Sequence, residues 1–354
     1  MSFLGALHRI NLVNGNSYLP ELIVTVAQLS LRDSVLNCIG KTPLQKLDLQ
    51  FNGRDYRIYA KFEFMNPSGS IKDRIAKYMI EEAERKNLLK PGHTIVEATS
   101  GNTGIALSMV GAAKGYKVLI VMPEHMTGER IKIMTNLGAT LCLTPKASGF
   151  EGALARAKKI AEDNEHYFLT NQFCNADNTL AHYYTTGREI AQQMNGEVDA
   201  FVAGVGTGGT LMGVGKALKE KNQNVRLIAV EPEEAAILSG RKVIRDHKIA
   251  GIGDGFIPEI VDMKLIDEII AIKSDNAVEM AKLLSSQFGL MVGVSSGANV
   301  LASTRILDEV GPSKKVVTVL PDRTERYFST DLYSSKKEQV RQCSKHCECP
   351  FDNL

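Results

Sequence analysis

The sequence predicts an α/β fold with two three-layer domains and mainly parallel, twisted sheets. Short apolar segments of strand length alternate along the chain with longer segments whose apolar residues recur at helical spacing. Apolar strands of this kind are buried on both faces, which is typical of parallel sheets covered by helices. The chain has 354 residues, which is enough for two such sheets with a cleft between them.

The alternation of elements begins near Asp33 and surrounds several short polar turns. In its first part the expected strands and helices are, in turn, 58–62, 71–86, 94–97, 104–113, 117–122, 140–143 and 152–163. In its second part, with helices between them, the expected strands are 200–203, 226–230 and 315–320. Pro123 ends the strand before it, because proline cannot donate to the ladder.

Composition and charge exclude several classes of protein. The 44% hydrophobic and 23% charged content is that of a globular protein, and a net charge of +2 gives no basic face for nucleic acid. No apolar run approaches the roughly 20 residues that span a bilayer. Residues 22–31 are short, contain Gln28 and lack a clear cleavage site, which argues against a signal peptide. Six cysteines in a chain of this length do not indicate a disulfide scaffold, so we expect a reducing, cytoplasmic location.

Lys72 lies in a Gly/Ser-rich turn, Asn66–Arg74, that opens an expected helix. A lysine that forms a Schiff base needs a neutral amine, which burial or a nearby cation supplies. The start of a helix between two domains is a suitable place for such a lysine. Taken alone, the turn is more typical of a solvated surface lysine.

A glycine-rich turn, Gly206–Thr210, joins an apolar strand to the next helix. Glycines let backbone N–H groups converge on a phosphate, and the helix N-terminus and the hydroxyls of Thr207 and Thr210 favour an anion there. A tight structural turn is the plain alternative. The pattern of a dinucleotide site is half met, with Glu231 at the end of the next strand. No Walker-type phosphate loop is present, which excludes that class of nucleotide-binding enzyme.

Two further turns are unusually polar. The loop before the helix at 104–113 holds four polar side chains within five residues, Thr99, Ser100, Asn102 and Thr103. Helix capping accounts for one or two of them, whereas a loop that binds a substrate carboxylate accounts for all four. In the turn 293–298, a serine hydroxyl facing a pyridine nitrogen would keep that nitrogen unprotonated, and helix capping is the alternative.

Together these segments resemble the cysteine synthase and cystathionine β-synthase family, whose enzymes carry pyridoxal 5′-phosphate (PLP) on a lysine. The resemblance covers roughly residues 34–334. The matching segments follow the family's order: Asn66–Arg74, Thr99–Gly104, Asn171-Gln172-Phe173, Ala181-His182-Tyr183, Gly206–Thr210, Gly251-Ile252-Gly253, Phe256-Ile257-Pro258 and Ser295-Ser296-Gly297-Ala298.

The resemblance implies fold type II of the PLP enzymes, with a smaller, mobile α/β domain that closes over the substrate. The smaller domain would comprise residues 34–43 and 66–176, and the larger one residues 44–65 and 177–334. Residues 1–33 would then be an N-terminal extension and residues 335–354 a C-terminal tail.

The resemblance also implies a role for each matching residue. Lys72 would carry the cofactor and take the α-proton, and Asn102 would contact the cofactor's 3′-oxygen. Ser296 would face the ring nitrogen, with Ser295 as the second choice. The phosphate would be held by Gly206, Thr207, Gly208, Gly209 and Thr210. The substrate would be held by Thr99, Ser100, Thr103, Gln172 and Gly251.

The family chemistry removes a β-substituent from a serine-derived amino acid and adds a nucleophile to the aminoacrylate that remains. The resemblance favours a cysteine synthase (O-acetylserine sulfhydrylase) among these transferases and lyases. A cysteine-consuming, sulfide-releasing enzyme that makes serine, cystathionine or lanthionine is the alternative. A catalytically silent relative that binds a partner in its cleft, and a nicotinamide-dependent oxidoreductase, represent other classes. A homodimer and a serine acetyltransferase tail as partner are implied by the family alone; no nucleic acid or membrane partner is expected.

Three stretches depart from the commonest pattern of acetylserine-using relatives. Asp254 stands where these relatives commonly have a small residue, and it could orient or deprotonate an incoming water or amine. A solvated loop aspartate is the alternative. Arg241 and Arg245 could attract an anionic substrate, although charged surface is the more common explanation. The segment 321–327 is more similar to branches that accept other donors or nucleophiles.

The tail holds three cysteines and a histidine between Cys343 and Cys349. Three thiols and an imidazole can fill a tetrahedral zinc site. However, Cys347 and Cys349 are separated by one residue rather than the usual two to four, and nothing downstream completes the set. We therefore expect no metal site there.

Overall fold

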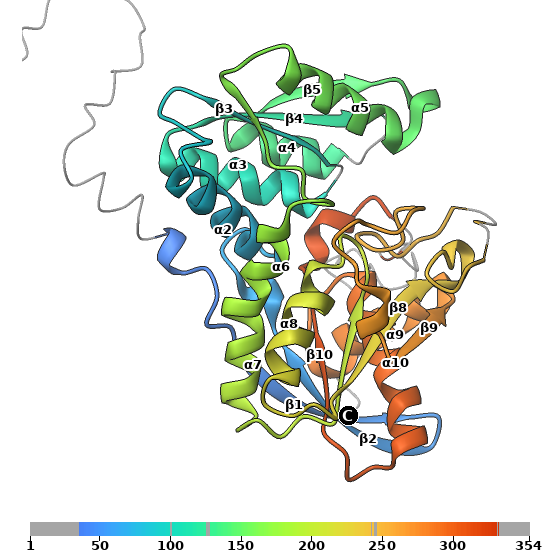
Figure 1. The fold of residues 1–354 in the computed structure, drawn as a ribbon. Helices are drawn as coiled ribbons and strands as arrows, with labels where there is room; N and C mark the ends of the chain where they lie inside the picture. The colour runs from blue at the N-terminus through green and yellow to red at the C-terminus, as the bar shows by residue number, and fades with distance from the viewer. Residues whose placement is uncertain are drawn as a thin grey trace, which may run out of the picture.

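The computed structural model describes residues 35–99, 101–124, 128–241, 243, 246–330 and 332. These residues form two sheets, one of six strands and one of four, each covered by helices (Figure 1). The predicted N-terminal extension, 1–33, and the predicted C-terminal tail, 335–354, lie outside the described residues. Within the described part of the chain, no helix has the length and apolar character needed to cross a bilayer.

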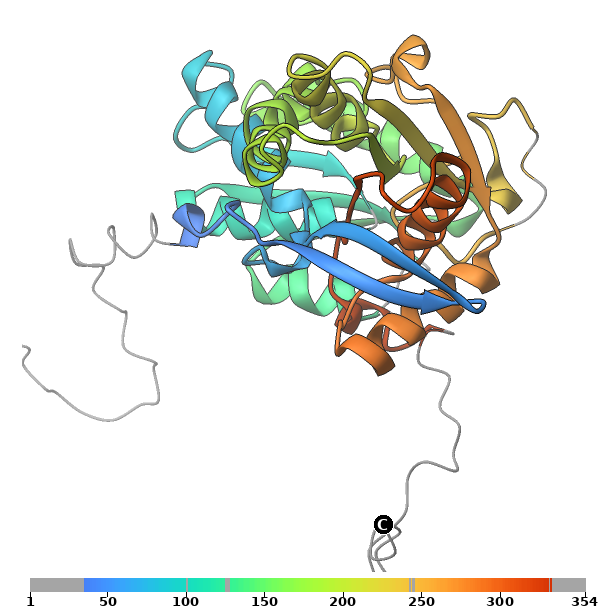
Figure 2. The same cartoon turned by 90° about the horizontal axis from the view of Figure 1, so that it is seen from below.

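The larger sheet has the strand order β1-β2-β10-β7-β8-β9. Its strands are, in that order, Leu44–Phe51, Arg54–Lys61, Val316–Val319, Ala200–Gly204, Arg226–Pro232 and Glu268–Ile272. Only the β1–β2 pair is antiparallel, and the other neighbours run parallel. The hairpin turn is Asn52-Gly53, in which both residues have positive φ (50° and 73°) as a two-residue turn of this kind requires. The hairpin lies at the end of the molecule away from the smaller sheet (Figure 2).

The smaller sheet has the order β5-β4-β3-β6 and is parallel throughout. Its strands are Thr140–Thr144, Lys117–Pro123, Thr94–Ala98 and Tyr167–Leu169. Neighbouring residues of β3 face opposite sides: Ile95 packs toward helices α2 and α3, and Val96 packs toward α5. These helices span Lys72–Arg85 (α2), Asn102–Lys114 (α3) and Gly149–Glu162 (α5). The sheet is therefore the middle layer of three.

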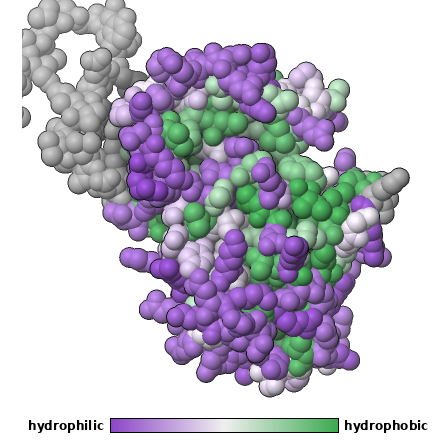
Figure 3. Space-filling model, viewed as in Figure 1, coloured by the Kyte–Doolittle hydropathy of each residue, from purple (hydrophilic) through white to green (hydrophobic). Residues whose placement is uncertain are grey.

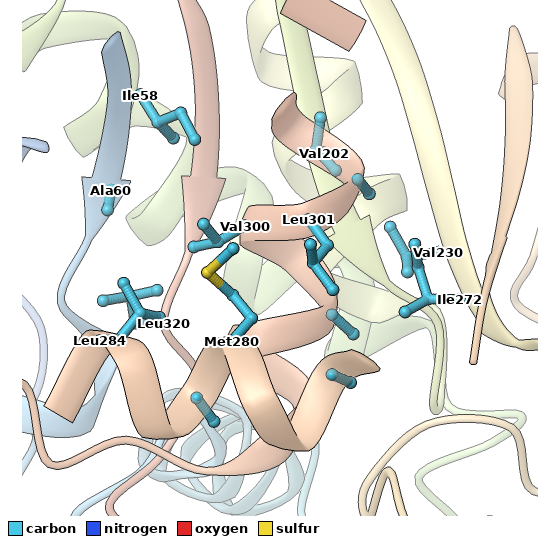
Figure 4. Close-up of a cluster of buried hydrophobic side chains, with 14 of the residues drawn as sticks. Ile58, Ala60, Val202, Val230, Ile272, Met280, Leu284, Val300, Leu301 and Leu320 are labelled. Carbon is cyan, nitrogen blue, oxygen red and sulfur yellow. The ribbon is translucent and has the colours of Figure 1, made fainter. Parts of the chain in front are cut away.

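The larger sheet is also the middle of three layers. On one face Val202, Val230 and Ile272 pack with side chains of α9, Ser274–Phe288, and α10, Val294–Val310 (Figure 4). On the other face the intervening strand residues pack with α7, Arg188–Gln193, and α8, Gly209–Lys219. The remaining helices are α4, Gly128–Asn136, and α6, Ala176–His182, which runs into a π-helical turn, Tyr183–Gly187.

The predicted fold class is confirmed, as are the expected strands and helices apart from their ends. The helix expected at 104–113 begins earlier, at Asn102, so the polar loop before it is shorter than the sequence suggested. Three strands were missed: β1, β6 and β9. β1 is an edge strand with alternating exposure, and β6 has three residues, so neither forms the continuous apolar run of a central parallel strand.

Candidate active site

A cavity of about 510 Å³ opens between the two sheets and is lined by residues from both. On the face of the molecule shown in Figure 3, apolar residues gather toward the middle, whereas polar residues cover the upper and lower ends. Five helices begin at or beside this cavity: α2 at Lys72, α3 at Asn102, α5 at Gly149, α8 at Gly209 and α10 at Val294. Three of them follow the carboxyl ends of parallel strands or the loops beside them, which is where α/β sheets place their ligands.

The cavity brings together most of the site residues expected from the sequence. Its wall includes Lys72, Thr99, Asn102, Thr103, Gln172, Gly206, Thr207, Gly208, Thr210, Gly251 and Asp254. Ser100 and Arg245 lie outside the described residues. Arg241 is exposed and does not line the cavity, so the structure gives no support for an anion site at this residue.

Lys72 lies at the first position of α2 with its amine in a crowded, poorly hydrated part of the cavity. Burial lowers the pKa of this amine, because a charged ammonium loses solvation there. The carboxylates of Asp254 and Asp322 act in the opposite direction. The net lowering increases the fraction of neutral amine, which is the nucleophilic form.

The glycine turn before α8 leaves no room for side chains. A Cβ at Gly206 would overlap with the carbonyl oxygen of Gly251, and a Cβ at Gly209 would overlap with Oδ1 of Asn178. Gly208 has φ +86°, a conformation that favours glycine. The backbone N–H groups of this turn and the N-terminus of α8 are therefore available to an anion that enters from the cavity.

Asn178 connects this turn with Gln172. Its Nδ2 donates to Thr207 Oγ1 at 3.0 Å and to the backbone oxygen of Gln172 at 2.8 Å. Thr210 Oγ1 lies 3.2 Å from Nε2 of His182, which is fully buried. Burial holds the pKa of His182 well below its usual value, and the positive charges of Lys72 and Arg74 add to this effect, so the ring is neutral.

The loop after β3 and the segment around Gln172 form one hydrogen-bonded unit. Thr103 Oγ1 donates to Gln172 Oε1 at 2.7 Å. Beneath them Glu97 accepts from the backbone N–H of Gln172 at 3.0 Å and from Thr170 Oγ1 at 2.5 Å. Burial raises the pKa of Glu97 to about 7, against the effect of these hydrogen bonds. Glu97 therefore holds Gln172 in place while its own charge depends on pH.

Asn102 is held by the segment that follows β10. Its Nδ2 donates to Asp322 Oδ2 at 2.6 Å, and its Oδ1 accepts from Nη1 of Arg326 at 2.6 Å. The hydroxyl of Tyr327 donates to the same oxygen of Asp322. These bonds fix which way the amide faces, with one N–H of Nδ2 left for a further acceptor.

The two serines at the start of α10 differ in position. Ser295 lines the cavity, whereas Ser296 is fully buried and its Oγ has no hydrogen-bond partner among the described residues. The sequence favoured Ser296 over Ser295 as the residue facing a ring nitrogen. The cavity wall gives Ser295 the more direct access.

Asp254 lies at the entrance of the cavity, on a loop with three glycines of positive φ, Gly251, Gly253 and Gly255. Its carboxylate reaches water through the cavity mouth but is closely surrounded by protein, and this crowding raises its pKa. The charges of Lys72 and His247 act in the opposite direction. Asp254 and Lys72 therefore line the same cavity and affect each other's charge.

Aromatic contacts and a histidine fix the position of this loop. The ring of Phe256 lies 5.0 Å from that of Phe173, which in turn lies 5.8 Å from that of Phe150 on α5. His247 Nε2 lies 3.0 Å from the backbone oxygen of Gly253. The loop that carries Asp254 is thus packed through Phe256 against Phe173 and, beyond it, Phe150 of α5.

Residues 35–322 match the family described as "Pyridoxal-phosphate dependent enzyme". The chain belongs to this family. A cysteine synthase from Staphylococcus aureus is 47% identical over 303 residues, which cover 85% of this chain and 97% of the relative. The suggested resemblance is therefore confirmed, and with it the dependence on PLP.

Solved structures of related PLP-dependent enzymes have the same fold as this chain. A cysteine synthase of Entamoeba histolytica has a TM-score of 0.80 and 41% identity, covering 93% of this chain and 96% of that one. A hydrogen sulfide-producing enzyme of Fusobacterium nucleatum has a TM-score of 0.83 and 41% identity, covering 87% and 93%. An aspartate-to-asparagine variant of a hydrogen sulfide-producing enzyme has been solved with an α-aminoacrylate intermediate, with a TM-score of 0.83 and 40% identity, covering 88% and 94%.

The residues of this cavity fit PLP. The turn Gly206–Thr210 offers the donors that a phosphate needs, and side chains on its glycines would fill that space. A poorly hydrated amine, that of Lys72, faces the same cavity, as does the hydroxyl of Ser295. Among the described residues no group of His, Cys, Asp and Glu side chains forms a metal-ligand set, and the cysteines of the tail lie outside these residues.

Several residues that support the PLP site were not expected from the sequence. They are Glu97, Asn178, Asp322, Arg326 and Tyr327. The last three lie in the segment 321–327, which the sequence singled out only for its departure from acetylserine-using relatives, without a role for any single residue. His182 was noted only as part of a family segment, and its neutral ring against Thr210 is a property of its burial.

Proposed function

We propose that this protein catalyses β-replacement on a serine-derived amino acid, with O-acetylserine and sulfide as the favoured pair. One observation carries the proposal: Lys72, a polar loop suited to a carboxylate and a glycine turn suited to a phosphate line one cavity. The similarity to cysteine synthases over most of the chain supports this assignment.

PLP, when bound, supplies an electron sink for negative charge that develops at the substrate Cα. Lys72 takes the proton from Cα and returns it, because its amine lines the cavity and burial lowers its pKa, which increases the fraction in the neutral, basic form. Thr99, Thr103 and Gln172 hold the substrate carboxylate, together with backbone N–H groups at the start of α3. The substrate would be held at its amino end, near Lys72 and the cofactor, and at its carboxylate. Its β-carbon would then face the cavity mouth, where the nucleophile enters.

Asn102 and Ser295 set the electronic state of the cofactor ring in this proposal. The remaining N–H of Asn102 donates to the 3′-oxygen, since its other polar atoms are engaged by Asp322 and Arg326. Ser295, rather than Ser296, faces the ring nitrogen, because it is the serine on the cavity wall. A neutral hydroxyl cannot stabilise a protonated ring nitrogen as a carboxylate would.

Asp254 favours a second candidate function, a cysteine-consuming reaction that releases sulfide. A carboxylate with a raised pKa at the cavity mouth can accept a proton from water or an amine as it attacks the substrate β-carbon. Sulfide does not need this help, because it is largely ionised near neutral pH. The likeness to hydrogen sulfide-producing enzymes is consistent with this alternative.

The first experiment asks whether the chemistry occurs at Lys72. The PLP-loaded protein and Lys72→Ala are mixed in turn with O-acetylserine, O-phosphoserine, serine and cysteine, and the visible absorbance is recorded. We expect the band of the wild type to shift with at least one amino acid and the variant to lack the lysine-bound band. An unchanged wild-type band with all four would contradict the proposed function and favour a silent relative.

The second experiment separates the two candidate reactions. Asp254→Asn is compared with Asp246→Asn, because Asp246 also lines the cavity and serves as a matched control. If Asp254 is the base, its variant loses about a hundredfold or more of the turnover with water or an amine, and much less with sulfide. Equal turnover of both variants with every nucleophile would remove Asp254 from the mechanism.

We further propose that the protein is a cytoplasmic homodimer. Its smaller domain, residues 34–43 and 66–176, moves relative to the larger one, residues 44–65 and 177–334. Family membership supports the dimer, and the low cysteine content supports a reducing location. Sedimentation of the purified protein tests the dimer, and scattering with and without substrate tests the closure. A serine acetyltransferase tail remains a candidate ligand of the same cavity.

A further inference from the structure

Arg130 is a buried cation that the chemistry above does not use. It lies in the first turn of α4, is 8% exposed and lines the same cavity as Lys72. Its Nε is buried without a partner, and no hydrogen bond or ion pair joins its guanidinium to another residue that the structure describes. Its guanidinium lies over the ring of Tyr327, whose centroid is 5.2 Å from Cζ.

Arg130 differs from the other two buried arginines, which both make hydrogen bonds within the described residues, although Nε of Arg326 also lacks a partner there. Arg74 makes hydrogen bonds with the carboxylates of Glu63 and Glu189 over 2.6–2.8 Å. Arg326 donates to Asn102 Oδ1 and to the backbone oxygen of Ser68, both at 2.6 Å. A buried guanidinium has five N–H donors and no way to lose its charge, so it normally has acceptors.

Two acidic residues, Glu129 beside Arg130 in the sequence and Asp322 in the same cavity wall, form no ion pair with Arg130. Glu129 accepts a hydrogen bond from Ser329 Oγ at 3.0 Å. Asp322 uses Oδ2 for Asn102 and Tyr327, and its Oδ1 has no hydrogen-bond partner among the described residues, but no ion pair joins it to Arg130. The N-terminus of α4, a helix of nine residues, adds a favourable partial charge for an anion at this position.

We propose that Arg130 forms a second anion subsite in the cavity, which binds a small oxyanion such as a phosphate or carboxylate group. The group is either part of the β-substituent of the amino-acid substrate or a free inorganic ion. The first case rests on the proposed β-replacement, and the second does not. This assignment places the anion site at Arg130, which lines the cavity, rather than at Arg241, which does not, or at Arg245, which lies outside the described residues.

Inorganic phosphate tests the subsite directly on the PLP-loaded protein. With the glycine turn occupied by the cofactor, phosphate must bind elsewhere to raise the melting temperature. We expect a saturable increase for the wild type. Arg130→Met, which keeps an apolar stem over Tyr327, should need about tenfold to a hundredfold more phosphate for half of the effect. The exposed Arg241→Met is the matched control and should resemble the wild type.

A kinetic comparison distinguishes the two sources of the anion. If the anion belongs to the substrate, Arg130→Met lowers kcat/KM for O-phosphoserine about tenfold or more relative to O-acetylserine. If that ratio stays constant while phosphate binding is lost, the ligand is the free ion. Arg130→Lys keeps the charge but not the planar fork, and should show an intermediate loss in either assay.

Two results would overturn the assignment. One is a wild-type holoenzyme whose melting temperature does not respond to phosphate and whose use of O-phosphoserine does not depend on Arg130. The other is an equal loss in Arg130→Met and Arg241→Met, which would indicate a general effect of surface charge. If the protein reacts with no amino acid, the proposed function fails, but the phosphate titration still decides whether the subsite exists.

Discussion

Ionisation of the buried Glu97 should make the free energy of unfolding depend on pH in a way that can be measured. Its carboxyl is 1% exposed at the carboxyl end of β3, and burial raises its pKa from 4.5 to about 7. Below pH 4.5 it is protonated in both the folded and unfolded chain and contributes nothing. Between pH 4.5 and 7 the unfolded chain releases the proton while the folded one keeps it, so folding becomes less favourable as the pH rises. Above pH 7 the full cost is present.

The size of the effect follows from the shift. The pKa moves from 4.5 to about 7, and each pKa unit corresponds to about 1.4 kcal/mol, so the total is about 3 kcal/mol. Glu97→Gln removes the ionisation. The amide also loses one of the three hydrogen bonds that the carboxylate accepts, from Thr170, Gln172 and Ala98, a constant cost of about 1–3 kcal/mol.

Urea unfolding of the cofactor-free protein at several pH values tests this reasoning. The free energy of unfolding of Glu97→Gln minus that of the wild type should increase by about 3 kcal/mol from pH 4.5 to above 7. Taking the difference cancels other groups, such as Asp73, whose pKa burial raises to about 6. Glu165→Gln changes a carboxylate that is 89% exposed and serves as the control. A difference that stays flat, or falls, over this range would refute the burial argument.

Two further predictions concern the cofactor turn and the buried ion network. In Gly209→Ala the new methyl group overlaps with Asn178 Oδ1, so we expect loss of PLP loading in absorbance titrations, whereas Gly128→Ala has open space and should load normally. In Arg74→Met the fully buried carboxylate of Glu63 loses its partner, so stability in urea should fall by about 3–5 kcal/mol at neutral pH. Recovery of most of this loss in Arg74→Met/Glu63→Gln would confirm the ion pair as the cause, and its absence would point to packing.

Local turns of the site could be predicted because each is a strand–turn–helix unit in the sequence. Lys72, the loop at Thr99–Gly104 and the turn at Gly206–Thr210 each combine a helix start with polar or glycine residues. The Asn52-Gly53 turn also carried a local hairpin signal, and β1 could have been predicted from it.

The residues that hold the site residues in place, such as Asp322 and Glu97, could not be predicted from local sequence in the same way. Asn102 and Asp322 are 220 residues apart, and nothing local indicates that one binds the other. Glu97 looks like any residue at the end of a strand, and its raised pKa results from burial under Gln172. The absence of a described partner for Arg130 is likewise a property of tertiary packing, because an arginine on a helix is usually solvated.

The bonds of Asn102 would connect cofactor binding with the proposed movement of the smaller domain. Asn102 begins a helix of the smaller sheet, whereas Asp322 and Arg326 follow β10 of the larger one. An opening of the cleft that separates Asn102 from Asp322 and Arg326 must break these two charged hydrogen bonds, each of which contributes about 1.5–3 kcal/mol. It would also hydrate Asp322, whose carboxylate opposes the lowered pKa of Lys72. Opening would therefore change the amine's surroundings as well as its access, and a substrate carboxylate bound to Thr103 and Gln172 would favour the arrangement in which both bonds are made.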